Sequence, residues 1–324
     1  MAGTAAAPTV TDDRTATAVI DIHQHLWPEE LLSALSRRRN LPRLRRAGAD
    51  WVVQLAGEPD AVVDLADHDP DRRARLARID GVDRVVVAPS SPIGIEALPP
   101  ADAEPLIRAY HEGVRALPHP FSGWATLSLH DRDADALQER LDEGFVGLCL
   151  PAAALGDPRG LDRLSALFDR LERHDAPLFV HPGPAPWARP PAPVDPRLPG
   201  WWSPLTAYVT QMHAAWHLWL AVGRRLHPEL RVCFALLAGL APLHRERRVL
   251  RGGSDDAVDG RLFYDTSSYG PGAIGQMVDT VGSDALVNGS DRPVDDLVAG
   301  HTGLDAHAIT RGNPARLFGW TEAQ

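Results

Sequence analysis

The sequence predicts a (β/α)8 barrel, and three observations lead to that fold. Eight short apolar runs recur along the chain, helical patterns separate most of them, and the length of 324 residues suits one such barrel. Runs that are apolar throughout are typical of parallel strands buried on both faces of a sheet. An open, doubly wound sheet is the alternative topology.

The eight expected strands are short runs rich in β-branched and apolar residues. They cover residues 19–26, 82–88, 121–129, 145–150, 177–181, 230–237, 261–265 and 285–291. Helices are expected between them at 106–114, 133–143, 161–174 and 205–226. A last short helix opens at Asn313 and Pro314, with asparagine as its cap and proline in its first turn.

Two stretches depart from this alternation of strands and helices. Residues 28–75 form a small excursion, in which 28–46 is expected to be largely helical and 51–56 to be a strand. Residues 182–204 contain eight prolines before Gly200 and the tryptophans Trp187, Trp201 and Trp202, which is typical of a lid or binding loop. A rigid surface linker is the alternative. Residues 1–17 are expected to be a disordered tail, and 18–324 a single barrel domain.

Composition narrows the possible functions. A net charge of −10 argues against a nucleic-acid partner, and no apolar run approaches the roughly 20 residues that span a membrane. The start of the chain lacks the features of a signal peptide, so a cytoplasmic location is expected. The chain has no lysine, which excludes a lysine Schiff base. Cys149 and Cys233 are expected to be buried free thiols.

Four chemically suitable side chains stand at the ends of predicted strands. His23 and His25 share one face of the first strand, because strand side chains alternate with a period of two. His181 ends the fifth strand and Asp291 the eighth. The carboxyl ends of barrel strands meet at one mouth, so these four residues predict a site for one divalent ion, zinc first and manganese second. Asp21 is expected to orient a histidine from behind.

Each of these residues also has a plainer interpretation. The histidine pair could simply end a half-buried strand, His181 could cap a strand, and Asp291 could be a turn residue. The combination of four such residues at three strand termini favours the metal site.

These motifs resemble the amidohydrolase superfamily, in particular its aminocarboxymuconate-semialdehyde-decarboxylase-like branch. The resemblance covers most of the chain and rests on the segments 21–25, 144–148, 178–183, 264–268, 289–293 and 312–318. It implies a (β/α)8 barrel with a single metal ion, with His23, His25, His181 and Asp291 as the matching ligands. The absence of lysine agrees with a mononuclear site, and the resemblance also implies a homodimer.

The chain departs from that family at the sixth strand. The family has a histidine six residues before a proline, and counting back from Pro242 places Leu236 there. Leucine can neither activate water nor steer a carbonyl group. His213 and His217, which share a helix face, are candidate substitutes, and His244 is a weaker one. Surface or structural roles are the alternative for these histidines.

Three functional hypotheses follow. The first is a metal-dependent hydrolase of a small aromatic or carboxylated substrate, with Asp291 moving the proton of a metal-activated water. The tryptophans of the loop would then cover a flat substrate, and Arg292 would bind a carboxylate or form an outward salt bridge. The second hypothesis is non-oxidative decarboxylation, with Asp291 protonating the substrate carbon. The third is a non-catalytic or altered-chemistry relative, which Leu236 supports.

Overall fold

The computed structural model describes residues 18–190, 195, 197–254, 259–295 and 305–320. The tail predicted to be disordered, 1–17, therefore lies outside the described residues, as do 191–194 and 196 of the proline- and tryptophan-rich loop. No helix in the described ranges is long and apolar enough to cross a membrane.

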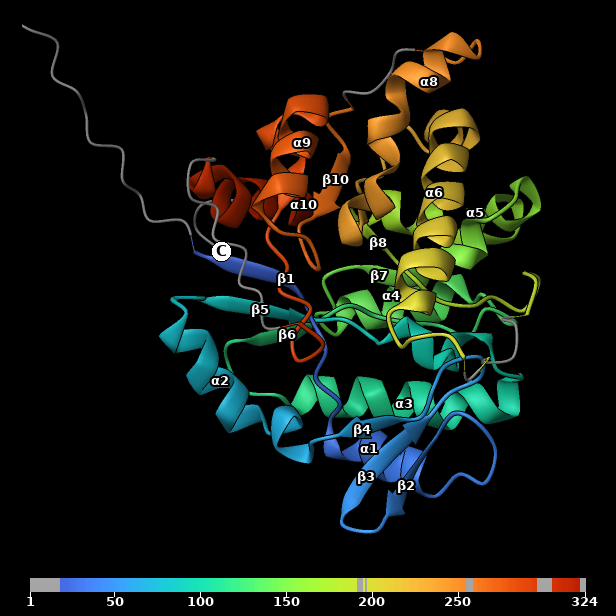
Figure 1. The fold of residues 1–324 in the computed structure, drawn as a ribbon, viewed down its shortest axis with the longest axis vertical. Coiled ribbons are helices and arrows are strands. Elements are labelled where there is room, and N and C mark those ends of the chain that lie inside the picture. The colour runs from blue at the N-terminus through green and yellow to red at the C-terminus, as the bar shows by residue number, and fades with distance from the viewer. Residues whose placement is uncertain (1–17, 191–194, 196, 255–258, 296–304, 321–324) are drawn as a thin grey trace, which may run out of the picture.

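Parallel strands in two groups build the centre of the molecule (Figure 1). One sheet has the order β1-β5-β6, and the other has the order β11-β10-β9-β8-β7. Their bounds are β1 (Ile20–Gln24), β5 (Arg84–Val87), β6 (Phe121–Gly123), β7 (Leu148–Pro151), β8 (Leu178–His181), β9 (Val232–Phe234), β10 (Leu262–Asp265) and β11 (Leu286–Val287). All of the pairings within these two sheets are parallel.

Main-chain bonds join the two sheets at both edges. Ala125, just after β6, bridges to Leu148 of β7, and its N–H donates to the carbonyl of Gly147 at 2.8 Å. At the other edge, Gln24 of β1 bridges to Arg292, and the N–H of Ile22 donates to the carbonyl of Asn288 at 3.0 Å. Eight parallel strands therefore follow one another around a ring, and the predicted (β/α)8 barrel is confirmed.

Helices cover the outside of the barrel. They are α1 (Glu29–Ser36), α2 (Pro70–Ile79), α3 (Pro100–Ala116), α4 (Ala134–Asp142), α5 (Pro158–Arg173), α6 (Val209–Leu218), α7 (Arg224–Leu226), α8 (Arg245–Leu250), α9 (Pro271–Val281) and α10 (Asn313–Phe318). The chain is helical from Pro204 to Leu226, with π-helical turns on both sides of α6. The leucine face of α5 is buried, and Cys149 and Cys233 are buried free thiols, as predicted.

The excursion differs from its prediction. The expected helix over 28–46 ends with α1 at Ser36, and the chain then forms an antiparallel sheet of β2 (Arg43–Ala47), β3 (Asp50–Gln54) and β4 (Ala61–Val63). The arginines of β2 resemble a solvated helix face, and Arg45 and Arg46 are exposed while Leu44 is buried. Pairing with β3 decides the conformation. This sheet lies beside α1 at the lower end of Figure 1.

Two expectations near the C-terminus are also wrong. The eighth strand ends at Val287, and Asp291 has a left-handed φ of 57°, which aspartate tolerates better than most residues. Asn313 does not cap a helix, because residues 308–312 are already helical. Its buried side chain instead donates to the carbonyls of Ser283 and Leu286 at 2.9 and 2.7 Å. Asn313 thus anchors α10 to β11.

We expect Asn313→Ala to lower the free energy of unfolding by about 2 kcal/mol, because two buried carbonyls lose their donor. Urea denaturation would measure the loss. Gln276→Ala, at an exposed position of α9, is the matched control and should be nearly neutral. Equal stability of the Asn313 variant and the wild type would show that this anchor contributes nothing.

Candidate metal centre

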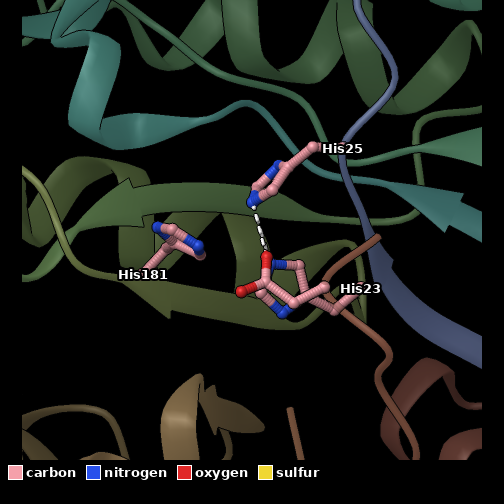
Figure 2. Close-up of side chains that lie close together, drawn as sticks. His23, His25 and His181 are labelled. Atoms are coloured by element: carbon pink, nitrogen blue, oxygen red, sulfur yellow. Dashed lines mark hydrogen bonds and ion pairs between the residues drawn. The ribbon is translucent and has the colours of Figure 1, made fainter. Parts of the chain in front are cut away.

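Three histidines and one aspartate from distant parts of the chain meet at the barrel mouth. His23 lies in β1, His25 directly follows it, His181 ends β8, and Asp291 follows β11. All four are buried, and their potential ligand atoms lie within 4.8 Å of one another. Figure 2 shows the three imidazole rings turned toward a common point. The structure thus brings together the four residues that the strand ends had suggested.

The tautomers of the three histidines are set by their outer neighbours. The Nδ1 atom of His23 donates to Asp265 Oδ2 at 2.7 Å. The Nδ1 atoms of His25 and His181 donate to the carbonyls of Ala88 and Pro182, both at 3.0 Å. Carbonyl and carboxylate oxygens only accept, so each neutral ring carries its proton on Nδ1. In this neutral form, each Nε2 directs a lone pair into the centre.

The spacing of these atoms suits a metal ion. The Nε2 atoms of His23 and His25 are 3.2 Å apart, and Asp291 Oδ1 lies 3.4 and 3.0 Å from them. Two ligands at about 2.1 Å from one tetrahedral ion are about 3.3 Å apart. Asp291 Oδ1 is buried, and its polar neighbours are these two histidine nitrogens. A set of imidazole nitrogens and a buried carboxylate oxygen fits a divalent cation, and it suits zinc and manganese alike.

The charge balance of the centre also favours a cation. Burial alone would lower the pKa of His23, but the carboxylates of Asp265 and Asp291 outweigh it and raise this pKa to about 9. Burial, followed by the neighbouring His23 and His25, holds the pKa of His181 well below its usual value. Burial opposes ionisation of Asp291, yet the histidines keep the pKa of its carboxyl below the usual range. The His23 ring therefore has a carboxylate on each side, Asp265 at Nδ1 and Asp291 near Nε2.

Asp265 is the main support of the centre and was not singled out from the sequence. Besides His23, it accepts from the main chain and the hydroxyl of Ser267, at 3.1 and 2.5 Å. Its close approach depends on Gly289, where an added Cβ would lie 1.9 Å from Asp265 Oδ1. Asp21 does not fill this role: its carboxylate accepts from Gln24 and from two main-chain N–H groups, so it holds the strand end and no imidazole.

Aromatic rings close the centre from below. The ring of Phe179 packs edge-on against His23, with 5.0 Å between centroids, and Trp124 stacks on Phe179 at 5.1 Å. The indole N–H of Trp124 donates to the carbonyl of Ile22 in β1 at 2.9 Å. These side chains are buried, so the centre opens in one direction only.

A cavity of about 530 Å³ lies on the open side. His25, His181 and Asp291 contribute to its wall, and so does Leu236, whose φ is 53°. Most of the remaining lining is apolar, including Val53, Leu55, Val62, Ile93, Leu205 and Val209. Among the described residues, no arginine lines this cavity. The β2-β3-β4 excursion thus supplies one wall of the candidate substrate site.

Comparisons with known proteins complete this description. No protein-family model and no curated protein matches the chain. Among solved structures, IDCase from Metarhizium anisopliae matches with a TM-score of 0.71 at 18% identity, covering 93% of this chain and 97% of that one. An amidohydrolase II matches with a TM-score of 0.70 at 20% identity, covering 93% and 100%.

A third match is a mutant 5-carboxyvanillate decarboxylase from Novosphingobium aromaticivorans, solved with manganese and 3-methoxy-4-hydroxy-5-nitrobenzoic acid. Its TM-score is 0.69 at 15% identity, with 94% and 98% of the two chains covered. The chain has the amidohydrolase fold. Four further matching structures are 5-carboxyvanillate or 2,6-dihydroxybenzoate decarboxylases, at TM-scores of 0.65 to 0.67. The resemblance seen in the sequence motifs is thus confirmed for the fold.

On this amidohydrolase fold, the predicted substrate tryptophans lie away from the cavity beside the metal centre. The indole of Trp187 donates to the carbonyl of Ala154 at 3.3 Å and packs under Arg163. Trp201 and Trp202 are largely exposed, and neither lines the cavity. The tryptophan that does line it is Trp27, two residues after His25 in the first loop. Its position next to the histidine motif is the sequence feature that could have identified Trp27 as a cavity residue.

The other predicted contacts are also placed elsewhere. Arg292 pairs with Asp80, which is the outward salt bridge foreseen as its alternative role. His213 lies against the carbonyl of Gly239 at 2.7 Å, and together with His217 and His244 it lines a separate surface pocket. None of these four side chains lines the cavity. The histidine that does so beyond the four-residue centre is His68, which the sequence did not single out.

We expect Asp265→Asn to weaken metal binding about 10- to 100-fold, because the His23 ring loses its charged acceptor. Competition with a chromogenic chelator would measure the change. Asp259→Asn is the matched control, since Asp259 pairs with Arg224 outside the centre. An unchanged affinity in the Asp265 variant would contradict the supporting role of this carboxylate.

Gly289→Ala should disrupt the same contact by steric means. The new methyl group would displace Asp265 or His23, whose Cβ lies 2.9 Å from the added atom. We expect weaker metal binding and a lower melting temperature. Gly275→Ala, in α9 with nothing within 4 Å of the added Cβ, should keep both. Wild-type metal affinity in the Gly289 variant would show that Asp265 does not need this close approach.

Proposed function

We propose that the protein is a metal-dependent decarboxylase of small aromatic or similarly flat carboxylic acids. The observation that carries the proposal is the apolar cavity that opens directly on the four converging side chains. His23, His25, His181 and Asp291 would hold one divalent ion, zinc or manganese. When bound, that ion would anchor the substrate carboxylate and offset its charge.

The cavity favours loss of a carboxylate. An ionised carboxyl group is costly to bury in apolar surroundings, whereas carbon dioxide is neutral. Away from the ion, no arginine among the described lining residues offers a compensating charge. The apolar walls therefore suit the body of the substrate and its product better than they suit the carboxylate that is removed.

Asp291 would carry the proton that the reaction needs. Its Oδ1 faces the histidines, while Oδ2 accepts a hydrogen bond from Ser268 at 3.2 Å, so the two oxygens have different surroundings. Because the histidines keep its carboxyl ionised, Asp291 would first take up a proton from solvent and then transfer it to the carbon that bears the carboxylate. The bond from that carbon to the carboxylate then breaks, its electron pair returns to the ring, and carbon dioxide leaves. A proton from solvent restores Asp291.

Leu236 weighs against hydrolysis as the main activity. Hydrolysis needs a group that orients and deprotonates water, and at this position the cavity wall offers only a hydrocarbon side chain. Decarboxylation needs a single proton donor, which Asp291 supplies. The matching decarboxylases of similar fold agree with this order of preference.

Hydrolysis through a metal-activated water is the second candidate, and it too would use Asp291 to move a proton. The amidohydrolase II match supports it. A homodimer and a cytoplasmic location remain predictions from the sequence.

The test uses the protein loaded with manganese or zinc and a panel of hydroxybenzoates. We expect release of carbon dioxide, measured by mass spectrometry with carboxyl-labelled substrate, and exchange of label into substrate in labelled bicarbonate. We expect Asp291→Asn to slow turnover by about 10²- to 10⁴-fold, because the proton donor is lost. Metal content of the variant must be measured alongside.

Asp284→Asn, at an exposed position, is the matched control and should turn over normally. Incorporation of heavy oxygen from labelled water into product, without carbon dioxide release, would favour hydrolysis. Full turnover by the Asp291 variant would refute the proton role.

A further inference from the structure

His68 stands in the wall of the same cavity and has no role in the chemistry described so far. It ends a 3-10 turn, Leu65–His68, just before α2, and it is 7% exposed. The side chain of Asp64 caps this turn by accepting from the N–H of Ala66 at 2.9 Å. His68 is therefore a buried imidazole in a tightly built segment that faces the candidate substrate.

The ring of His68 is fixed by Trp27. Its Nδ1 accepts a hydrogen bond from the main-chain N–H of Trp27 at 3.0 Å. The two rings are stacked, with 4.8 Å between centroids and an interplanar angle of 12°. The indole N–H of Trp27 in turn donates to Ser90 at 2.9 Å. These contacts set both the position and the plane of the imidazole.

Arg73 ties the His68 segment to the metal centre. Its guanidinium donates to the carbonyl of Asp67 at 3.0 Å and to the carbonyl of His25 at 2.9 Å. The distance between the histidine motif and the His68 turn is therefore held by a buried side chain.

The protonation state follows from these contacts. An Nδ1 that accepts a main-chain N–H carries no proton, so the proton of the neutral ring is on Nε2. Burial, followed by the charges of Arg73 and His25, lowers the pKa of His68 to about 4, against a smaller opposite effect of Asp64. The ring is thus neutral at pH 7, with one N–H. Among the described residues, Nε2 of His68 has no hydrogen-bond partner. This atom is accessible to solvent from the cavity.

We propose that His68 is a positioning residue, which donates one hydrogen bond from Nε2 to a ring-hydroxyl oxygen of the bound acid. This inference rests on the proposed function, because it assumes that the cavity holds the substrate. It also supplies a polar contact in a cavity where Leu236 stands at the position of the family's histidine. A ring whose other nitrogen is occupied can only donate, so it selects an acceptor oxygen and rejects an amino or ammonium group.

Binding of four acids to the metal-loaded protein tests the proposal without requiring turnover. The probes are benzoate and its three monohydroxy isomers, measured by isothermal titration calorimetry. We expect at least one hydroxybenzoate to bind about tenfold or more tightly than benzoate, which is the strength of one hydrogen bond to a charged or strongly polar group. In His68→Phe, which keeps the stacking on Trp27, this preference should vanish while benzoate binding stays unchanged.

Two variants separate positioning from structure. His68→Gln, which retains an N–H donor, should recover part of the preference. His130→Gln, at an exposed position in the segment after β6, should leave it intact. A preference that persists in His68→Phe overturns the role of His68. Failure of all four acids to bind the wild type instead counts against the proposed function.

Nitrogen NMR of the imidazoles provides an independent readout. We expect His68 to remain neutral, with its proton on Nε2, between pH 5.5 and pH 8, where an ordinary histidine of pKa about 6.5 would titrate. A proton on Nδ1, or titration with an ordinary midpoint, would overturn the inference whatever the binding data show.

Discussion

The site depends on one constraint. The Nδ1–H group of each of the three histidines must donate a hydrogen bond to an outer acceptor, so that the Nε2 lone pair of the neutral ring faces inward. Asp265 and two main-chain carbonyls provide those acceptors. Without them the rings could rotate or change tautomer, and the lone pairs would not converge. The rest of the local structure maintains this arrangement, from Gly289 beneath Asp265 to the aromatic floor of Phe179 and Trp124.

The barrel mouth also contains backbone that is costly to form. Residues 236–240 all have φ between 48° and 65°, although four of the five are not glycine. Such conformations cost roughly 1–2 kcal/mol per residue for L-amino acids. Buried contacts of Leu237 and Ala238 and the hydrogen bond from His213 to Gly239 hold this turn. The turn places Leu236 in the cavity wall, where it presents an apolar side chain.

Sequence reasoning predicted the barrel and the four converging residues because both follow from strand ends. Parallel strands place their carboxyl ends together, so His23 and Asp291 could be associated across more than 260 positions. It could not predict Asp265, Trp27 or His68 as parts of the site, because their roles depend on hydrogen bonds and stacking between separate elements. The tryptophan-rich loop was predicted to cover the substrate because of its composition. Composition does not determine whether a side chain lines the cavity.

The central claim is that one cation is shared by four side chains from three strand ends. Anomalous diffraction from crystals grown with manganese or zinc tests it most directly. The account predicts a single anomalous peak within bonding distance of the Nε2 atoms of His23, His25 and His181 and of an oxygen of Asp291. A peak bound elsewhere, or four side chains in place around no anomalous scatterer at saturating metal, would contradict it.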